Sequence, residues 1–381
     1  MKFMHSSILE PINTYIRSCQ RQFTELLRQI ITIPSPTGQE GEKAAWVLKY
    51  LHDLGQGQAY IDEAGNVLCP CQIEGQTAFP LYSAHMDTVF ESPTDLTPRI
   101  DGHILAAPSC GDNSAGVAGL LFLIAMIQDL DLSLPQGALF AFNVGEEGMG
   151  NLKGMRRIME DWKGRITEAL AVDCTFDDVV AIPVGSRRYR VSIEAQGGHS
   201  WMHFGHTSAI AAAASIISKL YSLPVPAAPK TTYNVGTICG GTTINSIAAN
   251  AEFTVDLRSE SHDELERLDK AFLRLIADVR RDGLTLTTTL LGERPCSSGA
   301  NISAQCRRIA AIRKRYGLGT PFISGSTDAN IPLSLGIPAL SFGVCRSHDE
   351  HTTREWLELD TIETGLKILA EYMLTNSTSS I

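Results

Sequence analysis

Five short segments of the chain carry side chains that bind divalent metals in proteins, and each follows a run of apolar residues. These segments contain His85 and Asp87, Asp112, Glu146 and Glu147, Asp173, and His348 with His351. Open α/β sheets build their sites at the ends of apolar strands, so we expect these side chains to converge. Two imidazoles and three carboxylates suit a pair of zinc-like ions that share one bridging carboxylate. The pattern therefore predicts a dinuclear metal site.

Taken singly, most of these segments have a structural alternative. A His-x-Asp pair such as 85–87 is more often a surface or capping pair. Asp112 could simply cap the apolar helix that follows it, and Asp173 could end a turn. The segment 348–352 could be a solvated loop. Only the pair Glu146–Glu147 favours a functional over a structural interpretation when taken alone. Two carboxylates at the end of a buried strand repel each other unless a cation binds one of them.

Composition excludes several classes of protein. The chain has 381 residues, of which 44% are hydrophobic and 19% charged, with 42 acidic and 32 basic side chains. The low charged fraction and the apolar content argue against disorder. A net charge of −10 argues against nucleic acid or an anionic membrane as the main partner. Single cores stop growing at about 250–300 residues, so the length predicts two domains.

The cysteines and the apolar runs point to a cytoplasmic protein. Nine cysteines are scattered without a Cys-x-x-Cys pair, which is typical of reduced thiols. The longest apolar run, 115–127, is shorter than the roughly 18 residues of a membrane span and predicts a buried core helix. Residues 1–11 reach Glu10 and Pro11 before an apolar block develops, so we expect no secretory signal.

The elements that must position the candidate ligands alternate between strands and helices. After a helical region at about 8–54, apolar strands are predicted at 79–84, 137–144 and 168–172, directly before the ligand segments. Helices separate these strands, which indicates a layered α/β sheet. The same rhythm resumes after Pro295 and ends in a helix near 354–374.

A different order of elements occupies residues 185–296. The pattern there is β-α-β-β-α-β, that of a small α+β (ferredoxin-like) sandwich. We interpret residues 1–184 and 297–381 as one α/β domain that contains 185–296 as an insertion. The alternative is two consecutive domains that meet near 185–190. The ligand order favours the insertion, because four ligand segments precede it and His351 follows it.

The ordered set of motifs resembles the dizinc metallopeptidases and deacylases related to peptidase T. That family includes glutamate carboxypeptidase, aminoacylase and succinyl-diaminopimelate desuccinylase. The resemblance rests on the ligand segments above and extends over nearly the whole chain, from about Ile33 to Leu374. It also rests on motifs elsewhere, namely Gly197-Gly198-His199-Ser200, Gly240–Ile247, Asp256–Ser259 and Gly325–Asn330. The resemblance implies a layered α/β catalytic domain with an inserted dimerisation or lid domain.

The resemblance also implies roles for single residues. His85 and Asp173 would bind one divalent ion, Glu147 and His351 the other, and Asp112 would bridge them. The ions would be zinc, with cobalt or manganese as alternatives. Asp87 would orient His85, and Glu146 would be the general base. The remaining implied roles are oxyanion stabilisation by His199 from a partner subunit and substrate binding by Asn245, Arg258, Gly325, Ser326 and Thr327.

Some of these roles have alternatives, and three segments depart from the family pattern. His199 could be a polar residue that only makes hydrogen bonds within the fold, and Arg258 could form an ion pair with Glu252 or Glu260. Asn113 stands where many relatives have a second aspartate. The polar segment before His351 makes His348 a rival ligand or a pocket residue. The bulky side chains of 201–204 could narrow the pocket or pack at a dimer contact.

The expected activity is hydrolysis of an amide bond. The stretch 184–191 and the Gly-Asp-Asn form at 111–113 resemble peptidase T, which favours an aminopeptidase acting on short peptides. The alternative is an N-acyl-amino-acid deacylase or a carboxypeptidase, for which Arg258 would bind a terminal carboxylate. A non-catalytic metal-binding relative is the third reading. The resemblance further implies a homodimer through the inserted domain.

Overall fold

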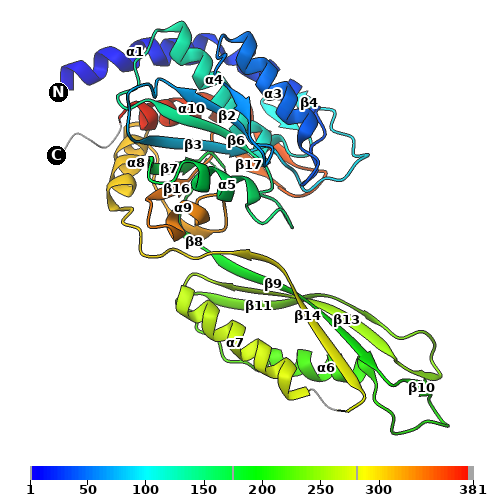
Figure 1. Ribbon diagram of the computed structural model, residues 1–381. Coiled ribbons are helices and arrows are strands. Elements are labelled where there is room, and N and C mark those ends of the chain that lie inside the picture. The colour runs from blue at the N-terminus through cyan, green and yellow to red at the C-terminus, as the bar shows by residue number, and fades with distance from the viewer. Residues whose placement is uncertain (1, 174–175, 280–281, 376–381) are drawn as a thin grey trace. The chain divides into compact units, whose positions relative to one another are not determined.

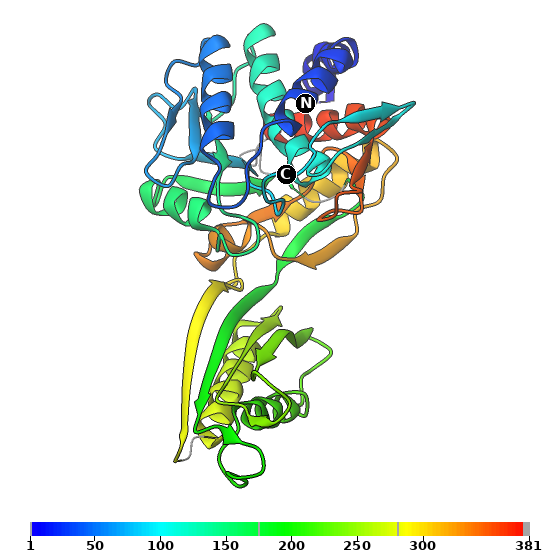
Figure 2. The same ribbon diagram turned by 90° about the vertical axis from the view of Figure 1, so that its right-hand side faces the viewer.

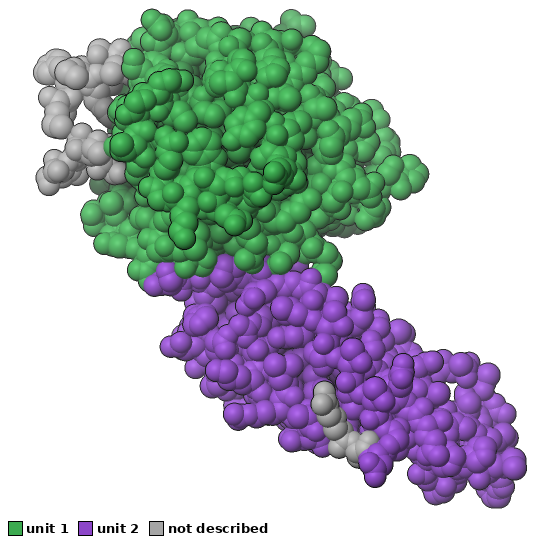
Figure 3. Space-filling model, viewed as in Figure 1, with its two compact units in different colours: residues 1–182, 299–381 green, residues 183–298 purple. Residues whose placement is uncertain are grey.

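The computed structural model describes residues 2–173, 176–279 and 282–375 (Figure 1). The chain divides into two compact units, coloured separately in Figure 3. Unit 1 comprises residues 1–182 and 299–381, and unit 2 comprises residues 183–298. The limits predicted from the sequence, 185 and 296, fall just inside unit 2. Unit 1 is thus formed by both ends of the chain.

Unit 1 is built on an eight-stranded sheet with the strand order β1-β2-β6-β3-β7-β16-β8-β15. Its four central strands run parallel, whereas β2 and β8 pair antiparallel with their neighbours. The central strands are fully or almost fully buried, which explains their continuous apolar sequences. The strands span β1 Tyr60–Ile61, β2 Val67–Cys71, β3 Phe79–His85, β6 Ala138–Asn143, β7 Ile166–Ala171, β8 Val179–Pro183, β15 Phe322–Gly325 and β16 Ala339–Ser341.

Helices cover both faces of this sheet and form two hydrophobic cores. One core joins alternate strand residues such as Tyr82 and Phe140 to most of the helices, and the other joins Leu81 and Leu139 to α5 and α9. This layering confirms the predicted fold class. The helices of unit 1 span α1 Lys2–Ser18, α2 Gln20–Ile31, α3 Gly41–Asp53, α4 Gly116–Asp129, α5 Lys153–Asp161, α8 Ser303–Arg315, α9 Asn330–Ser334 and α10 Leu359–Leu374.

The apolar helix α4 lies in the interior of unit 1. Together with the π-helical turn η1 (Cys110–Ala115), it is long and apolar enough to cross a membrane by length and composition. However, 94% of the 18-residue apolar stretch within that segment is buried in the protein. Burial on all sides explains why this helix is apolar around its whole circumference. The prediction of a core helix at 115–127 is therefore confirmed.

A second, smaller sheet of unit 1 was not anticipated from the sequence. It has the order β17-β18-β5-β4, with β4 Arg99–Asp101, β5 Ile104–Ala106, β17 Arg346–His348 and β18 Trp356–Glu358. The final helix was predicted to begin near Arg354, but residues 356–358 form β18 and pair with β5. That part of the prediction was wrong, because the hydrogen bonds to β5 take the place of a first helical turn.

Unit 2 has the predicted β-α-β-β-α-β order. Its four-stranded antiparallel sheet has the order β11-β13-β9-β14, as expected for a split βαβ sandwich. Helices α6 and α7 pack on one face of this sheet around Phe253 and Phe272 (Figure 2). The elements span β9 Gly185–Ala195, β10 Gly198–His199, α6 Ala209–Leu220, β11 Thr231–Gly240, β12 Ser246–Ile247, β13 Asn250–Ser259, α7 His262–Val279 and β14 Leu284–Arg294.

Candidate metal centre

Three adjacent parallel strands deliver candidate ligands to one edge of the large sheet. His85 is the last residue of β3, Glu146 and Glu147 follow β6, and Asp173 follows β7. Because β6, β3 and β7 are neighbours and parallel, their carboxyl ends meet at the same edge. All four side chains are buried. The candidate ligand segments that follow these strands therefore converge at one edge of the sheet, as expected from the sequence.

Asp112 reaches the same edge from the start of the buried helix. It lies in η1, where the chain has not yet adopted regular helical dihedrals, with φ −106° and ψ 94° at Asp112. The preceding Ser109 is left-handed (φ 62°), and its hydroxyl donates a hydrogen bond to the main-chain carbonyl of Asp112 at 2.7 Å. Asp112 is therefore held by an irregular turn and does not act as a simple helix cap.

The five predicted ligands form two groups that share Asp112. His85 Nε2 lies 3.1 Å from Asp112 Oδ1 and 3.7 Å from Asp173 Oδ1. His351 Nε2 lies 2.9 Å from Asp112 Oδ2 and 3.0 Å from Glu147 Oε1. In each group the ligand atoms lie within 4.8 Å of one another. We call His85, Asp112, Glu147, Asp173 and His351 the ligand cluster.

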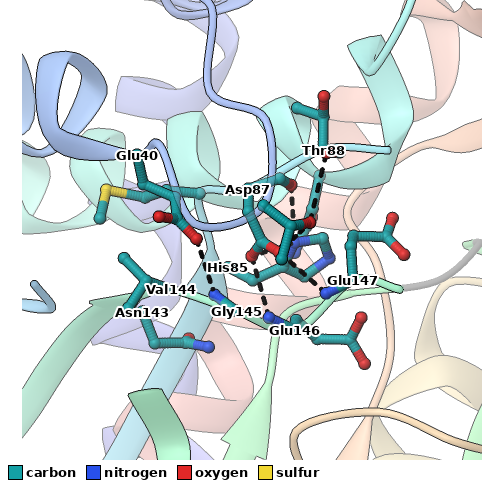
Figure 4. A network of polar contacts seen from close by, with 12 residues as sticks. Glu40, His85, Asp87, Thr88, Asn143, Val144, Gly145, Glu146 and Glu147 are labelled. Carbon is teal, nitrogen blue, oxygen red and sulfur yellow. Dashed lines mark hydrogen bonds and ion pairs between the residues drawn. The ribbon is translucent and has the colours of Figure 1, made fainter. Parts of the chain in front are cut away.

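Glu146 and Asp87 lie beside the ligand cluster. A ligand atom of Glu146 falls within 4.8 Å of those of His85 and Glu147. Asp87 accepts hydrogen bonds from the main-chain N–H groups of Glu146 at 3.0 Å and Glu147 at 2.8 Å (Figure 4). His85 Nδ1 lies 3.1 Å from the main-chain carbonyl oxygen of Asp87 and 3.6 Å from its Oδ1. Asp87 thus fixes both the turn after β6 and the imidazole that ends β3.

The electrostatics of the cluster are those of cationic positions surrounded by carboxylates. Burial lowers the pKa of His85, but the contacts with Asp112, Asp173 and Asp87 outweigh it and raise that pKa well above the ordinary value. Hydrogen bonds to Asp112 and Glu147 raise the pKa of His351 to about 11. Burial raises the pKa of Asp112, but the two imidazoles prevail and lower it. The carboxylates thus make this cluster a favourable place for cations.

The mixed set of donors fits two divalent ions. Imidazole nitrogens and carboxylate oxygens are the ligands that zinc takes in open, catalytic sites. Asp112 offers one oxygen to each group, as a bridging carboxylate requires. The described residues of unit 1 therefore include a complete set of candidate ligands for a dinuclear centre.

His348, the rival ligand, is engaged elsewhere. Its Nε2 lies 3.2 Å from Glu358 Oε1, and its ring stacks on Trp356 with 4.0 Å between ring centroids. Among the described residues, one candidate ligand group contains His351 and none contains His348. The geometry therefore supports His351 as the ligand and gives His348 a structural position in the smaller sheet.

Glu355 is a site residue that the sequence did not reveal. This buried carboxylate accepts hydrogen bonds from the main-chain N–H groups of Ser109 (2.8 Å), Gly111 (2.7 Å) and Asp112 (2.9 Å). Gly111 must be a glycine, because a Cβ there would lie 2.3 Å from Ser347 Cβ. Burial raises the pKa of Glu355 to about 7, while the three N–H groups oppose that rise. Glu355 thus holds the turn that presents Asp112.

Replacing Glu355 by glutamine is expected to weaken metal binding roughly 10–100-fold, a typical effect for a residue that orients a ligand. The amide keeps the shape of the side chain, but one of its two terminal atoms becomes a donor that faces main-chain N–H groups. Calorimetric titration of the metal-free protein with Zn²⁺ measures the change. The matched control is Glu74→Gln at an exposed position of unit 1, and equal affinities for both variants and wild type would contradict this role for Glu355.

The turn before α3 supports the site from a second side. Thr37 Oγ1 donates to Asp87 Oδ2 at 3.0 Å, and Glu40 Oε1 accepts from the main-chain N–H of Gly145 at 3.1 Å. Lys43 is buried close to Asp87, and burial lowers its pKa to about 8 while the Asp87 charge opposes the shift. Nothing in the sequence indicated that this turn would contact the site.

Asp328 is a further buried carboxyl group near the cluster. Its Oδ2 lies 2.6 Å from Asn143 Nδ2, and Asn143 is the last residue of β6. Burial raises the pKa of Asp328 to about 7, and the charges of Asp173 and Asp87 add to the rise. The Asp328 carboxyl group thus joins the segment 325–330 to the end of β6, the strand that precedes Glu146 and Glu147.

The predicted substrate-binding residues fall in both units. Gly325, Ser326 and Thr327 belong to unit 1, where Thr327 is buried and its N–H donates to Asn330 Oδ1 at 3.1 Å. His199, Asn245 and Arg258 belong to unit 2. Arg258 lies on β13, and its Nε pairs at 2.7 Å with Asp256 rather than with Glu252 or Glu260. The roles of these six residues in substrate binding or catalysis stay predictions.

Comparison with known proteins decides the family. The model of peptidase family M20/M25/M40 matches residues 81–375, which include every member of the ligand cluster. The chain belongs to this family. Its membership confirms the resemblance stated from the motifs and makes the protein a metal-dependent amidohydrolase.

The proteins that this chain resembles include enzymes named as a hydrolase, a deacetylase and an aminopeptidase. A LysW-lysine/LysW-ornithine hydrolase of Pyrococcus abyssi is 34% identical over 134 residues, only 35% of either chain. An acetylornithine deacetylase of Myxococcus xanthus is 24% identical and covers 74% of this chain and 75% of that protein. The crystal structure of aminopeptidase PepT from Bacillus cereus matches with a TM-score of 0.75 at 20% identity, covering 93% of this chain and 98% of that one. This last likeness shows a shared fold.

Proposed function

We propose that this M20 protein is an aminopeptidase that hydrolyses short peptides with two divalent ions, most simply zinc. The observation that carries the proposal is the pair of ligand groups that share Asp112, with Glu146 next to Glu147. His85 and Asp173 would hold one ion, and Glu147 and His351 the other. The bound ions would supply Lewis-acid polarisation of the amide carbonyl and a water of lowered pKa.

The protein's own side chains would move the protons. Glu146 would take a proton from the attacking water and return it to the leaving nitrogen as the amide bond breaks. Asp87 would keep Glu146 in place, because it accepts the hydrogen bond of the Glu146 main chain. His199 would donate a hydrogen bond to the oxyanion that develops on the carbonyl oxygen.

Metal binding is expected to stabilise unit 1. The cluster gathers several carboxylates at a buried edge, and cations would relieve their repulsion. At a free Zn²⁺ concentration of 100 times Kd, binding to the folded state alone adds about 2.7 kcal/mol per site. Differential scanning calorimetry with and without Zn²⁺ tests this, with Mg²⁺ as the comparison ion. An unchanged Tm at saturating Zn²⁺ would argue against a specific site.

The preference for peptides is supported by the fold shared with an aminopeptidase over 93% of the chain. The second candidate is an N-acyl-amino-acid deacylase, which the relation to an acetylornithine deacetylase favours. A panel of tripeptides, N-acetyl amino acids and C-terminally amidated peptides separates the candidates. The proposal expects the highest kcat/KM for tripeptides with a free N-terminus. Faster hydrolysis of N-acetyl amino acids than of tripeptides would contradict the aminopeptidase proposal and support the deacylase.

A homodimer through unit 2 belongs to the same proposal. Strand β11 lies at an edge of the four-stranded sheet and exposes residues 236–240, with Ile238 57% exposed. An exposed edge of this kind can pair with the same strand of a second copy. Light scattering coupled to gel filtration measures the oligomeric state. A monomer with full activity would exclude a role for His199 in a partner's site.

A cytoplasmic location is also proposed. It is supported by the cysteines of the described residues, which are all free thiols. Fractionation of the source cells tests it, and recovery of the protein outside the cytoplasm would overturn it.

A further inference from the structure

His199 is the last residue of β10 in unit 2, and the loop that begins with it is not held by hydrophobic packing. Residues 198–205 are exposed, and the bulky side chains of Trp201, Met202 and Phe204 are 87%, 75% and 92% exposed. Apolar burial within unit 2 therefore contributes little to the conformation of this loop, here called the His199 loop (residues 199–206). Its order must come from directed contacts.

Two imidazoles supply such contacts. The main-chain N–H of His199 donates to His203 Nδ1 at 2.9 Å, and the main-chain N–H of His203 donates back to the carbonyl of His199 at 2.9 Å. The His203 ring stacks on His206, with 4.9 Å between centroids and 8° between planes. His206 Nδ1 lies 2.8 Å from the carbonyl of Gly197. The loop is thus closed at both ends by histidine rings.

Gly198 shows how closely the His203 ring approaches the main chain. Gly198 has φ +136°, and a Cβ at this position would lie 2.7 Å from His203 Nδ1. A side chain at 198 would therefore displace the imidazole. The glycine and the imidazole form one packed unit at the base of the loop.

The geometry of the closed loop also favours one tautomer of the neutral His199 ring. The main-chain N–H groups of Trp201 and Met202 point at His199 Nδ1 from 3.3 and 3.4 Å. A nitrogen that accepts hydrogen bonds carries no proton, so the neutral ring holds its proton on Nε2. Nε2–H is the donor that the oxyanion role of His199 requires.

We propose that His203 is a positioning residue that holds the His199 loop so that His199 presents Nε2–H outward. This inference rests on the proposed function, in which His199 donates to the oxyanion. His203 acts through its Nδ1 acceptor and through its contact with Gly198, and it does not touch the substrate. Its sequence position four residues after His199 gives it a direct reach to the main chain of that residue.

Three substitutions distinguish the contribution of the Nδ1 acceptor of His203 from that of its aromatic ring. His203→Phe keeps an aromatic ring for stacking on His206 but has no acceptor. His203→Asn loses the ring but places Oδ1 near the position of Nδ1. His203→Ala loses both. His103→Phe, at an exposed histidine of unit 1, is the matched control.

The first readout is kinetic and uses the zinc-loaded full chain. Loss of one hydrogen bond that fixes a catalytic donor is expected to lower kcat about tenfold in His203→Phe, with KM and metal content unchanged. His203→Asn is expected to recover activity to within about threefold of wild type. In a His199→Ala background, His203→Phe is expected to have no further effect, because the two residues act as one unit.

The second readout is independent of activity. Long-range ¹H–¹⁵N NMR of the histidine rings reports which nitrogen carries the proton. Wild type is expected to show His199 as the Nε2–H tautomer, and His203→Phe is expected to show a mixture of both tautomers. An unchanged tautomer and an unchanged kcat in His203→Phe would overturn the inference.

The same experiments distinguish failure of the inference from failure of the proposed function. If His199→Ala keeps the wild-type kcat, the oxyanion role of His199 is wrong and the His203 proposal loses its basis. If His199→Ala loses activity while His203→Phe keeps both activity and tautomer, only the positioning role fails. A lower Tm of unit 2 in His203→Phe with a wild-type kcat would assign His203 a structural role alone and would likewise overturn the proposal.

Discussion

Replacing Glu146 by glutamine is expected to lower kcat for peptide hydrolysis by about 10²–10⁴-fold, the usual contribution of a general base. The variant is expected to retain both divalent ions, because the two ligand groups that share Asp112 do not include Glu146. Glutamine has the same shape but cannot accept a proton from water. Steady-state kinetics and metal analysis of the same sample measure both quantities.

One contact of the turn after β6 is unchanged by this substitution, because the main-chain N–H of Glu146 donates its hydrogen bond to Asp87. Glu160→Gln, at an exposed position of α5, is the control and should keep the wild-type kcat. If Glu146→Gln hydrolyses peptides at more than a third of the wild-type rate, Glu146 is not the base. If it loses the metal as well, Glu146 is a ligand.

Replacing Asp112 by asparagine is expected to have the largest effect on metal binding. Asp112 Oδ1 lies by His85 and Oδ2 by His351, so each group uses one carboxylate oxygen. Asparagine keeps a single oxygen and removes the negative charge that both ions would share. We expect the affinity for Zn²⁺ to fall at least about 100-fold and catalysis to be lost. Calorimetric titration and metal analysis after gel filtration measure the loss.

Asp101→Asn provides the comparison for Asp112→Asn. Asp101 is exposed on β4 and should leave the metal stoichiometry at two ions per chain. Retention of two tightly bound ions by Asp112→Asn would show that the ions do not share this carboxylate. The dinuclear arrangement would then need another bridging group.

Much of the architecture followed from local sequence patterns. The continuous apolar runs at β3, β6 and β7 predicted apolar strands, and the alternation of α and β elements predicted the layered fold. The smaller sheet escaped prediction because its strands are three residues long and show no readable alternation. Trp356–Glu358 became a strand through pairing with β5, a partner some 250 residues earlier in the chain.

Some residues of the candidate site could likewise be predicted from the sequence, whereas others could not. The candidate ligands could be predicted because each lies in a short polar segment next to an apolar one, so the signal is local. The residues that support them could not, since their roles depend on distant contacts. Glu355 meets the main chain of Asp112 across 243 positions, and Asp328 meets Asn143 across 185. No spacing rule connects such pairs, and only the folded chain reveals them.

The most direct test of the central claim is a titration of the metal-free protein with Zn²⁺ in which tripeptide hydrolysis is followed at each addition. A centre in which Asp112 joins two ions predicts that activity appears with metal and reaches its plateau at two equivalents per chain. Full activity without added metal, or no hydrolysis of any tripeptide or N-acetyl amino acid with two ions bound, would contradict the account.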